Sequence, residues 1–238
     1  FMSWQMLEEI EDWEDSLDQL LVTLPIVGCC FKKTYFDLAD RKVKSYLVDA
    51  KELVVNYHAK NLETASRITN VMQLTPNQMV ERVRKGEFLD LEWGEPTTDE
   101  DYDSNDEDAP HTLYEQHRWW DLDGDGYQEP YVVTVHADTE QVARIASRYD
   151  ADGIVTDEKG NIVKIDPVQY FTRFLFMPGF DRNFYGMGYG ALLGDLNSAI
   201  NSIINQLLDA GTLSNRQSGW VGKGINLGRG DEALFKPG

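Results

Sequence analysis

The chain is poor in the residues that mark disulfide scaffolds and membrane anchors. It has two cysteines in 238 residues, Cys29 and Cys30. Neighbouring residues of a strand point to opposite faces, so this pair predicts neither a mutual disulfide nor a zinc site. The longest apolar run, 20–31, is too short to span a membrane and is interrupted by Thr23, Pro25 and Gly28. With no signal-peptide pattern at its start, we expect an intracellular protein.

Basic residues are also scarce. The sequence has 22 Lys and Arg against 41 Asp and Glu, which gives a formal net charge of −19. Affinity for nucleic acid depends on clustered Lys and Arg, so this charge balance excludes a surface that binds the phosphates of nucleic acid tightly. The hydrophobic content of 42% is nevertheless enough for the core of one large domain or two modest ones.

Motifs of catalysis are missing as well. The four histidines show no metal-ligand spacing and none lies in a nucleophile motif, although His117 and His136 flank one loop and would face each other across a hairpin. The glycine tract 186–190 lacks the spacing and the lysine of a phosphate loop, so we attribute it to a tight turn against neighbouring backbone. We therefore expect no enzyme.

Periodicity predicts an α+β fold with antiparallel hairpins. Four helices are predicted. The first covers 3–22 and is ended by Pro25, and the second covers about 62–72. The third begins at the N-cap Thr75, continues through Pro76 and Gln78 and ends at Gly86, and the fourth runs from about 190 to a C-cap at Gly211. Strands are predicted over 26–37 and 42–48, on both sides of an aspartate-rich loop at 121–126, and over 141–149 and 170–176. Turns are predicted at 150–153 and 158–161. The acidic segment 87–108 has no Lys or Arg and is predicted to be a mobile loop.

The loop beginning at Asp121 has the first half of a calcium-binding pattern. Its carboxylates are Asp121, Asp123 and Asp125, followed by Gly126, with Glu129 at the ninth position. The twelfth position, where a helix-loop-helix site needs glutamate, is Val132. Three close carboxylates favour a bound Ca²⁺, but Asp and Gly also favour plain hairpin tips. Both interpretations stay open: no cofactor is required, and Ca²⁺ is the ion that the four carboxylates would hold.

The predicted helix after residue 190 carries two stripes. Its broad apolar stripe comprises Leu192, Leu193, Leu196, Ile200, Ile203, Ile204, Leu207 and Leu208. Its polar stripe comprises Asn197, Asn201, Asn205 and Asp209 at steps of four residues. A helix with a broad apolar stripe and an asparagine stripe is suited to packing between like neighbours.

Taken in order, these segments resemble the portal proteins of tailed bacteriophages, closest to the podovirus-type group. The segments that carry the resemblance are 20–31, the hairpin 119–135, the glycine tract 184–194, the helix 196–209 and the closing stretch from Gly222-Lys-Gly224 to Lys236-Pro-Gly238. None of these motifs is catalytic, so the specificity comes from their joint order.

The resemblance implies a subunit of a ring of about a dozen copies at one capsid vertex, through which DNA is packaged and later ejected. Residues 1–180 would form the wing domain, 181–215 the glycine turn and first stem helix, and 216–238 the start of the clip. The stem-helix residues that would pack between subunits or line the channel are Leu196, Asn197, Ile200, Asn201, Ile203, Ile204, Asn205, Leu207 and Asp209. The implied partners are other portal subunits, the terminase, and capsid and head-completion proteins. DNA would pass non-specifically, without a membrane, and the protein would reside at the portal vertex of the virion and in host cytoplasm during assembly.

The resemblance also implies that this chain is a fragment, because portal proteins carry a second stem helix, tunnel loop and crown after the first clip residues. We therefore expect a monomer or a small oligomer in solution rather than a twelve-fold ring. The rival interpretation is a stand-alone calcium-binding β-rich adaptor with the aspartate loop as its centre. An enzyme with a metal in that loop is the third and weakest interpretation.

Overall fold

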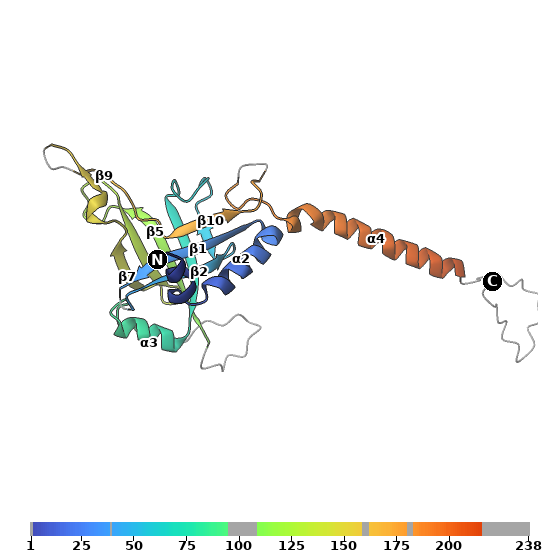
Figure 1. The fold of residues 1–238 in the computed structure, drawn as a ribbon, viewed down its shortest axis with the longest axis horizontal. Coiled ribbons are helices and arrows are strands. Elements are labelled where there is room, and N and C mark those ends of the chain that lie inside the picture. Colours follow the sequence, from blue (N-terminus) through green and yellow to red (C-terminus); the bar gives the residue numbers. More distant parts are fainter. Residues whose placement is uncertain (1, 39, 95–108, 159–161, 180–182, 216–238) are drawn as a thin grey trace, which may run out of the picture. The chain divides into compact units, whose positions relative to one another are not determined.

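The computed structural model describes residues 2–38, 40–94, 109–158, 162–179 and 183–215. The chain divides into two compact units, residues 1–188 and 189–238 (Figure 1). The fold is α+β, with antiparallel sheets in the first unit and one long helix in the second. None of the helices in the described ranges is both long and apolar enough to cross a membrane.

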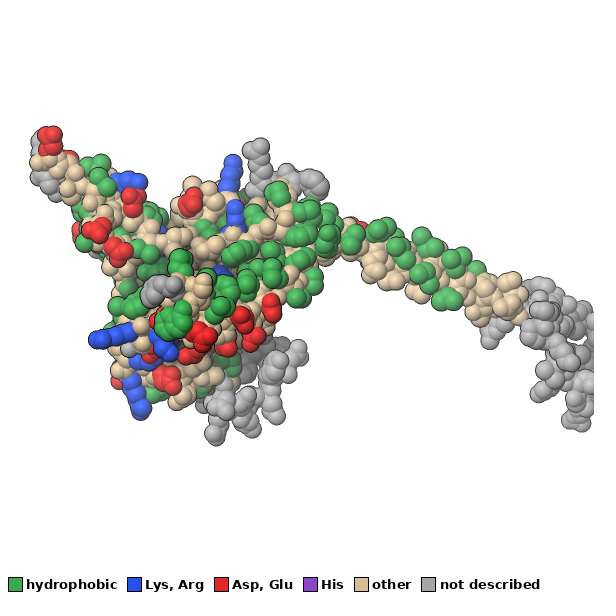
Figure 2. All heavy atoms as spheres, in the orientation of Figure 1, with side chains coloured by type: hydrophobic (Ala, Val, Ile, Leu, Met, Phe, Trp, Pro, Cys, Tyr) green, Lys and Arg blue, Asp and Glu red, His purple; other side chains and the backbone are tan. Residues whose placement is uncertain are grey.

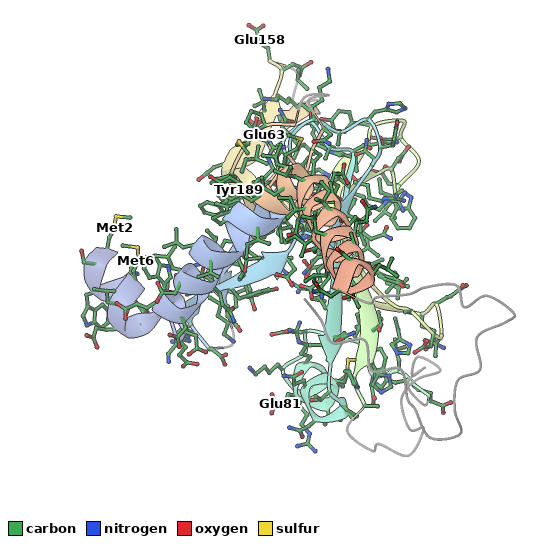
Figure 3. The ribbon with its side chains drawn as sticks, turned by 90° about the vertical axis from the view of Figure 1, so that its right-hand side faces the viewer. Met2, Met6, Glu63, Glu81, Glu158 and Tyr189 are labelled. Carbon is green, nitrogen blue, oxygen red and sulfur yellow. The ribbon has the colours of Figure 1, made fainter. Side chains whose placement is uncertain are left out.

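The N-terminal helical region differs from the prediction of one helix over 3–22 ended by Pro25. It consists of α1 (Met2–Trp4), the π-helical turn η1 (Gln5–Glu9) and α2 (Trp13–Val27). Asp12 adopts a left-handed conformation (φ 56°) and interrupts the helix. Pro25 lies inside α2, where its missing N–H removes only one hydrogen bond near the helix end. Figure 3 shows Met2 and Met6 projecting from this region.

The first sheet has the strand order β10-β1-β2 and includes the hairpin predicted at 26–48. Its strands are β1 (Cys29–Asp37), β2 (Lys42–Asp49) and β10 (Phe171–Leu175). Helix α2 lies beside β1 and β2 (Figure 1). Both cysteines of β1 are buried free thiols, which confirms the prediction that they form no disulfide with each other.

The second sheet has five antiparallel strands in the order β3-β4-β5-β6-β7. They are β3 (Leu53–Val55), β4 (Arg67–Leu74), β5 (His111–Trp120), β6 (Glu129–His136) and β7 (Val142–Ser147). The predicted helix over 62–72 is wrong. Ile68, Asn70 and Leu74 are buried at even spacings along β4, which is the period of a strand, and β4 pairs with β5 along its whole length.

The local sequence signals for α3 and for the turn at 150–153 are confirmed. Helix α3 (Pro76–Arg84) begins at the predicted capping box: Gln78 N–H donates to Thr75 Oγ1, and Thr75 N–H donates to Gln78 Oε1. Met79 of this helix is buried, whereas Val80 is exposed. The turn predicted at 150–153 contains a 3₁₀ turn, η2 (Ala151–Gly153).

The small hairpin of β8 (Ile154–Thr156) and β9 (Ile162–Ile165) encloses the turn predicted at 158–161, most of which lies outside the described residues. The predicted mobile loop at 87–108 also falls largely outside them, since 95–108 are not described. The part that is described turns inward: Phe88 is buried and Trp93 packs against its ring at 6.3 Å.

Two apolar clusters form the core of the first unit. The larger lies between the two sheets, with Phe31 of β1 stacked on Phe184 at 5.6 Å; its other buried members are Cys29, Val48, Leu53, Ala59, Leu62, Ala65, Ile68 and Phe171. The smaller joins α3 to the second sheet through Met79, Leu74, Phe88, Leu113 and Ala143. Burial of large apolar side chains from both sheets therefore holds the two sheets together.

The glycine tract lies in close contact with neighbouring backbone, as predicted: it crosses the end of α2 at Gly28. Gly28 ends α2 with φ 97°, and a Cβ there would overlap the backbone of Met187 and Gly188. Gly186 has φ 66°, and a Cβ on it would lie 2.6 Å from the carbonyl oxygen of Met177. Met187 N–H donates to that same oxygen at 2.9 Å. The tract thus fixes the segment that precedes the long helix.

The long helix α4 (Tyr189–Asn215) forms the described part of the second unit. It continues past Gly211, so the predicted C-cap at that glycine is wrong. One glycine costs a helix only about 1 kcal/mol relative to alanine, so a single glycine is tolerated within a helix of this length. Residues 216–238, predicted as the start of a clip, lie outside the described residues.

Candidate functional site: an exposed helix and an aspartate loop

Helix α4 exposes a long apolar stripe. Ile200 is 45% exposed, Ile203 55% and Leu207 67%, and no residue of the helix is buried. Figure 2 shows hydrophobic side chains along its length. The exposed members are Leu192, Leu193, Leu196, Ile200, Ile203, Ile204, Leu207 and Leu208. Contiguous exposed apolar surface of this kind marks an interaction site, so α4 is the first candidate.

The opposite side of α4 is polar and almost free of charge. Asn197, Asn201, Asn205 and Asp209 are all exposed, as is every other residue of the helix. Asp195 and Asp209 are the charged residues of the helix, and it has no Lys or Arg. Amide side chains both donate and accept hydrogen bonds, so this stripe can pair with a copy of itself or contact solvent at a pore.

The aspartate loop lies between β5 and β6, as predicted. Asp121 accepts hydrogen bonds from the backbone N–H groups of Gly124 (2.7 Å) and Gly126 (3.0 Å), one on each carboxylate oxygen. Asp123 accepts from Asp125 N–H (3.2 Å), and Asp125 accepts from Tyr127 N–H (2.7 Å). These bonds wrap the backbone around the first carboxylate and order the loop.

Three of the four predicted metal ligands come together. Asp121, Asp123 and Asp125 each present a carboxylate oxygen, and these oxygens lie within 4.8 Å of one another. Oxygens bound to one Ca²⁺ at 2.3–2.6 Å lie within that span. Glu129 is used differently: it accepts a 2.7 Å hydrogen bond from the Tyr131 hydroxyl, which raises the pKa of Tyr131 to about 12.

The two histidines that flank the loop do not face each other, so that interpretation is wrong. The register of the hairpin places His117 opposite Val132 and His136 opposite Leu113. Four residues separate the two positions along the ladder. An eight-residue connection, 121–128, sets this register, and the sequence pattern alone did not specify it.

His117 instead belongs to a buried polar group that the sequence did not reveal. Lys33 Nζ of β1 donates to both oxygens of Glu115 on β5, at 2.6 and 2.8 Å, and His117 Nε2 lies 2.9 Å from Glu115 Oε1. All three side chains are buried. This group joins the two sheets across the core. Its signal in the sequence was a lysine in the middle of an apolar strand.

Electrostatics fix the protonation of this buried group. Burial alone would raise the pKa of the Glu115 carboxyl, but Lys33 and the hydrogen bond with His117 outweigh burial and hold it well below its usual range. Burial lowers the pKa of His117, against the opposing effect of Glu115. A neutral His117 with its proton on Nε2 donates to Glu115, and its buried Nδ1 has no hydrogen-bond partner among the described residues. The group is closed to solvent, so its role is structural.

The comparisons with known proteins assign no family. No protein-family model matches the chain, and the search of curated proteins finds no match. The functional conclusion therefore depends on α4, on the aspartate loop and on the resemblance of the sequence segments.

Proposed function

We propose that this chain is a structural subunit of a bacteriophage portal ring, the channel for DNA packaging into the capsid and for DNA ejection. The observation that carries the proposal is the apolar stripe of α4, which no described residue of its own unit covers. The order of the aspartate hairpin, the glycine crossing and the striped helix supports it, since that order is where the sequence resembles portal proteins.

A ring explains both stripes of α4. In a closed ring each subunit contacts its two neighbours with different surfaces, so a stem helix needs two contact flanks. The apolar stripe supplies them, because Ile203 and Ile204 are about 100° apart on a helix and lie toward its two edges. Burying the exposed half of a Leu or Ile side chain contributes about 1 kcal/mol, and the stripe repeats that gain along about five turns.

The charge of the chain is compatible with passage of DNA. A net charge of −19 repels phosphates, so DNA would meet a surface on which it slides without binding. The Asn stripe of α4 adds polar groups without positive charge, which is the chemistry that a channel wall requires.

Cross-linking of single-cysteine helices tests the proposal. A mixture of Ile203→Cys and Ile204→Cys chains, treated with a short bis-maleimide, should give more covalent dimer than either variant alone, because helices that pack as in a ring bring different flanks together even within a small oligomer. Native thiols interfere little: Cys29 and Cys30 are buried, and burial raises the pKa of Cys29 to about 12. Denaturing gels quantify the dimer.

The matched control replaces residues on the polar side. Ser198→Cys and Ser202→Cys lie on the same helix and are equally accessible, but they point away from the apolar stripe. Their mixture should give at most a few per cent of the dimer from the first pair. Equal yields from the two mixtures, or the highest yield from Ile203→Cys alone, would contradict a ring contact through the flanks of the stripe.

A second candidate is the calcium-binding β-rich adaptor, which the clustering of Asp121, Asp123 and Asp125 favours. It predicts that the wild-type chain releases or absorbs heat on titration with CaCl₂, and that the double variant Asp123→Asn, Asp125→Asn does not. Glu129→Gln is the matched control, because Glu129 lies apart from the cluster and its loss should leave the heat unchanged. A wild-type chain without any heat of binding rules out the adaptor.

A further inference from the structure

Two buried histidines and an aspartate gather where β5 begins and β6 ends. His111 is the first residue of β5 and His136 the last residue of β6, and both side chains are buried. Leu113 is the partner of His136, so His111, two residues earlier, is its diagonal neighbour on the same face of the sheet. Nδ1 of His111 lies 3.1 Å from Nε2 of His136, and Oδ2 of Asp138 lies 3.8 Å from the same Nε2.

These distances suit a small divalent ion. In tetrahedral Zn²⁺ sites, with Zn–N near 2.0–2.1 Å, two imidazole nitrogens lie about 3.4 Å apart. The nitrogens of His111 and His136 are at 3.1 Å, and the ligand atoms of all three residues lie within 4.8 Å of one another. Asp138 lies on the turn after β6 and is accessible to solvent, and its carboxylate is within reach of the same point as the two imidazole nitrogens. Water would take the fourth position.

The surroundings hold the histidines in place. Nδ1 of His136 lies 2.9 Å from Thr139 Oγ1, and the ring of Trp93 packs edge-on against its imidazole at 5.5 Å. Ala137 N–H donates to Thr112 C=O at 2.9 Å, which extends the β5–β6 pairing into the turn. Histidines that bind metal usually donate their second N–H to a neighbouring oxygen, and Thr139 provides that oxygen.

We propose that His111, His136 and Asp138 bind Zn²⁺ and so clamp the start of β5 to the end of β6. The donor set of two imidazoles and one carboxylate favours a borderline divalent metal over Ca²⁺, which prefers oxygen ligands. This site is separate from the aspartate loop, at the other end of the same hairpin, and it does not depend on the portal proposal.

The alternative is a plain hydrogen bond between the two rings. In that state Thr139 N–H donates to Nδ1 of His136 (3.3 Å), and the proton on Nε2 is donated to His111 Nδ1. Zinc binding places the proton of His136 on Nδ1, where it is donated to Thr139 Oγ1, and both facing nitrogens direct lone pairs to the ion. The two states differ by one bound cation, so metal binding distinguishes them.

Titration of the chelator-treated chain with ZnCl₂ tests the site, with a chromophoric chelator as competitor and Co²⁺ as a spectroscopic probe. We expect one equivalent of Zn²⁺ at this site, a rise in Tm of several degrees, and at least about tenfold weaker binding in His111→Gln and in Asp138→Asn. His58→Gln is the matched control, because His58 is an exposed histidine outside the cluster. It should bind as the wild type does.

Three outcomes would overturn the proposal: no competition by the wild-type chain, equal weakening by His58→Gln, or loss of binding in Asp123→Asn, Asp125→Asn. The last would place the ion in the aspartate loop. Should circular dichroism show that His111→Gln does not fold, Asp138→Asn decides alone, because it changes one accessible turn residue. Zinc affinity unchanged in that variant refutes the site.

Discussion

Replacing Glu115 with Gln should lower the free energy of unfolding by about 3–5 kcal/mol, because the substitution leaves Lys33 buried without its counter-charge. Both side chains are about 8% exposed, and Lys33 Nζ donates to both carboxylate oxygens. His117 loses its charged acceptor in the same step. Urea unfolding followed by tryptophan fluorescence measures the change, as a shift of midpoint at constant slope.

The matched control removes both charges. Lys33→Met, Glu115→Leu keeps side-chain volume and leaves no unpaired ion in the core, so it should cost far less than Glu115→Gln and lie within about 1–2 kcal/mol of the wild type. If the double variant is as unstable as the single one, the loss comes from packing and the ion-pair explanation is wrong. Comparing the two variants separates the effect of the unpaired charge on stability from the effect of altered packing.

The same group predicts an acid limit to stability. The pKa of Glu115 is depressed in the folded state, so its contribution is complete above the unfolded value of about 4.3 and is lost as pH falls through the lower folded value. The wild type should therefore lose stability on acidification below about pH 4, and Glu115→Gln should lack this part of the loss. The difference between the two curves should shrink as the pH falls.

Local chemistry explains which elements were predictable. The capping box of α3 needs Thr75 and Gln78 to be only three residues apart, and it formed as predicted. The aspartate hairpin was also recognisable, because turn residues and β-branched flanks are adjacent in sequence. Strand β4 was mistaken for a helix because its identity depends on pairing with β5, about 44 residues away, and pairing overrides weak local preference.

The candidate sites followed the same rule. The stripes of α4 and the carboxylates of the aspartate loop were predictable because each set lies within one continuous segment. Lys33 and Glu115 are 82 residues apart, and His111 and His136 are 25 apart, so no local motif joins either pair. Once Trp120 is known to pair with Glu129, counting away from the loop along β5 and β6 places Leu113 opposite His136. His111 is then a diagonal neighbour of His136. The strand register is thus the information that the sequence pattern did not supply.

Replacing Gly28 with Ala should cost about 2–5 kcal/mol, the second large effect that the structure predicts. The left-handed conformation at φ 97° accounts for about 1–2 kcal/mol of strain in a residue with a Cβ. Overlap of that Cβ with the backbone of Met187 and Gly188 adds about 1–3 kcal/mol, because main chain on both sides cannot turn away as a side chain would. Chemical denaturation measures the sum.

Gly86→Ala is the control that separates backbone strain from steric overlap. Gly86 also has a left-handed conformation, φ 75°, but a Cβ there would meet nothing within 4 Å in the described part of the chain. That variant should lose only the strain, about 1–2 kcal/mol. The excess loss in Gly28→Ala then measures the close crossing that fixes the segment leading into α4, since Gly28 C=O accepts from Phe176 N–H and Met177 C=O accepts from Met187 N–H. Equal losses in the two variants would mean that the crossing is not tightly packed in solution, and that the segment before α4 can move independently of α2.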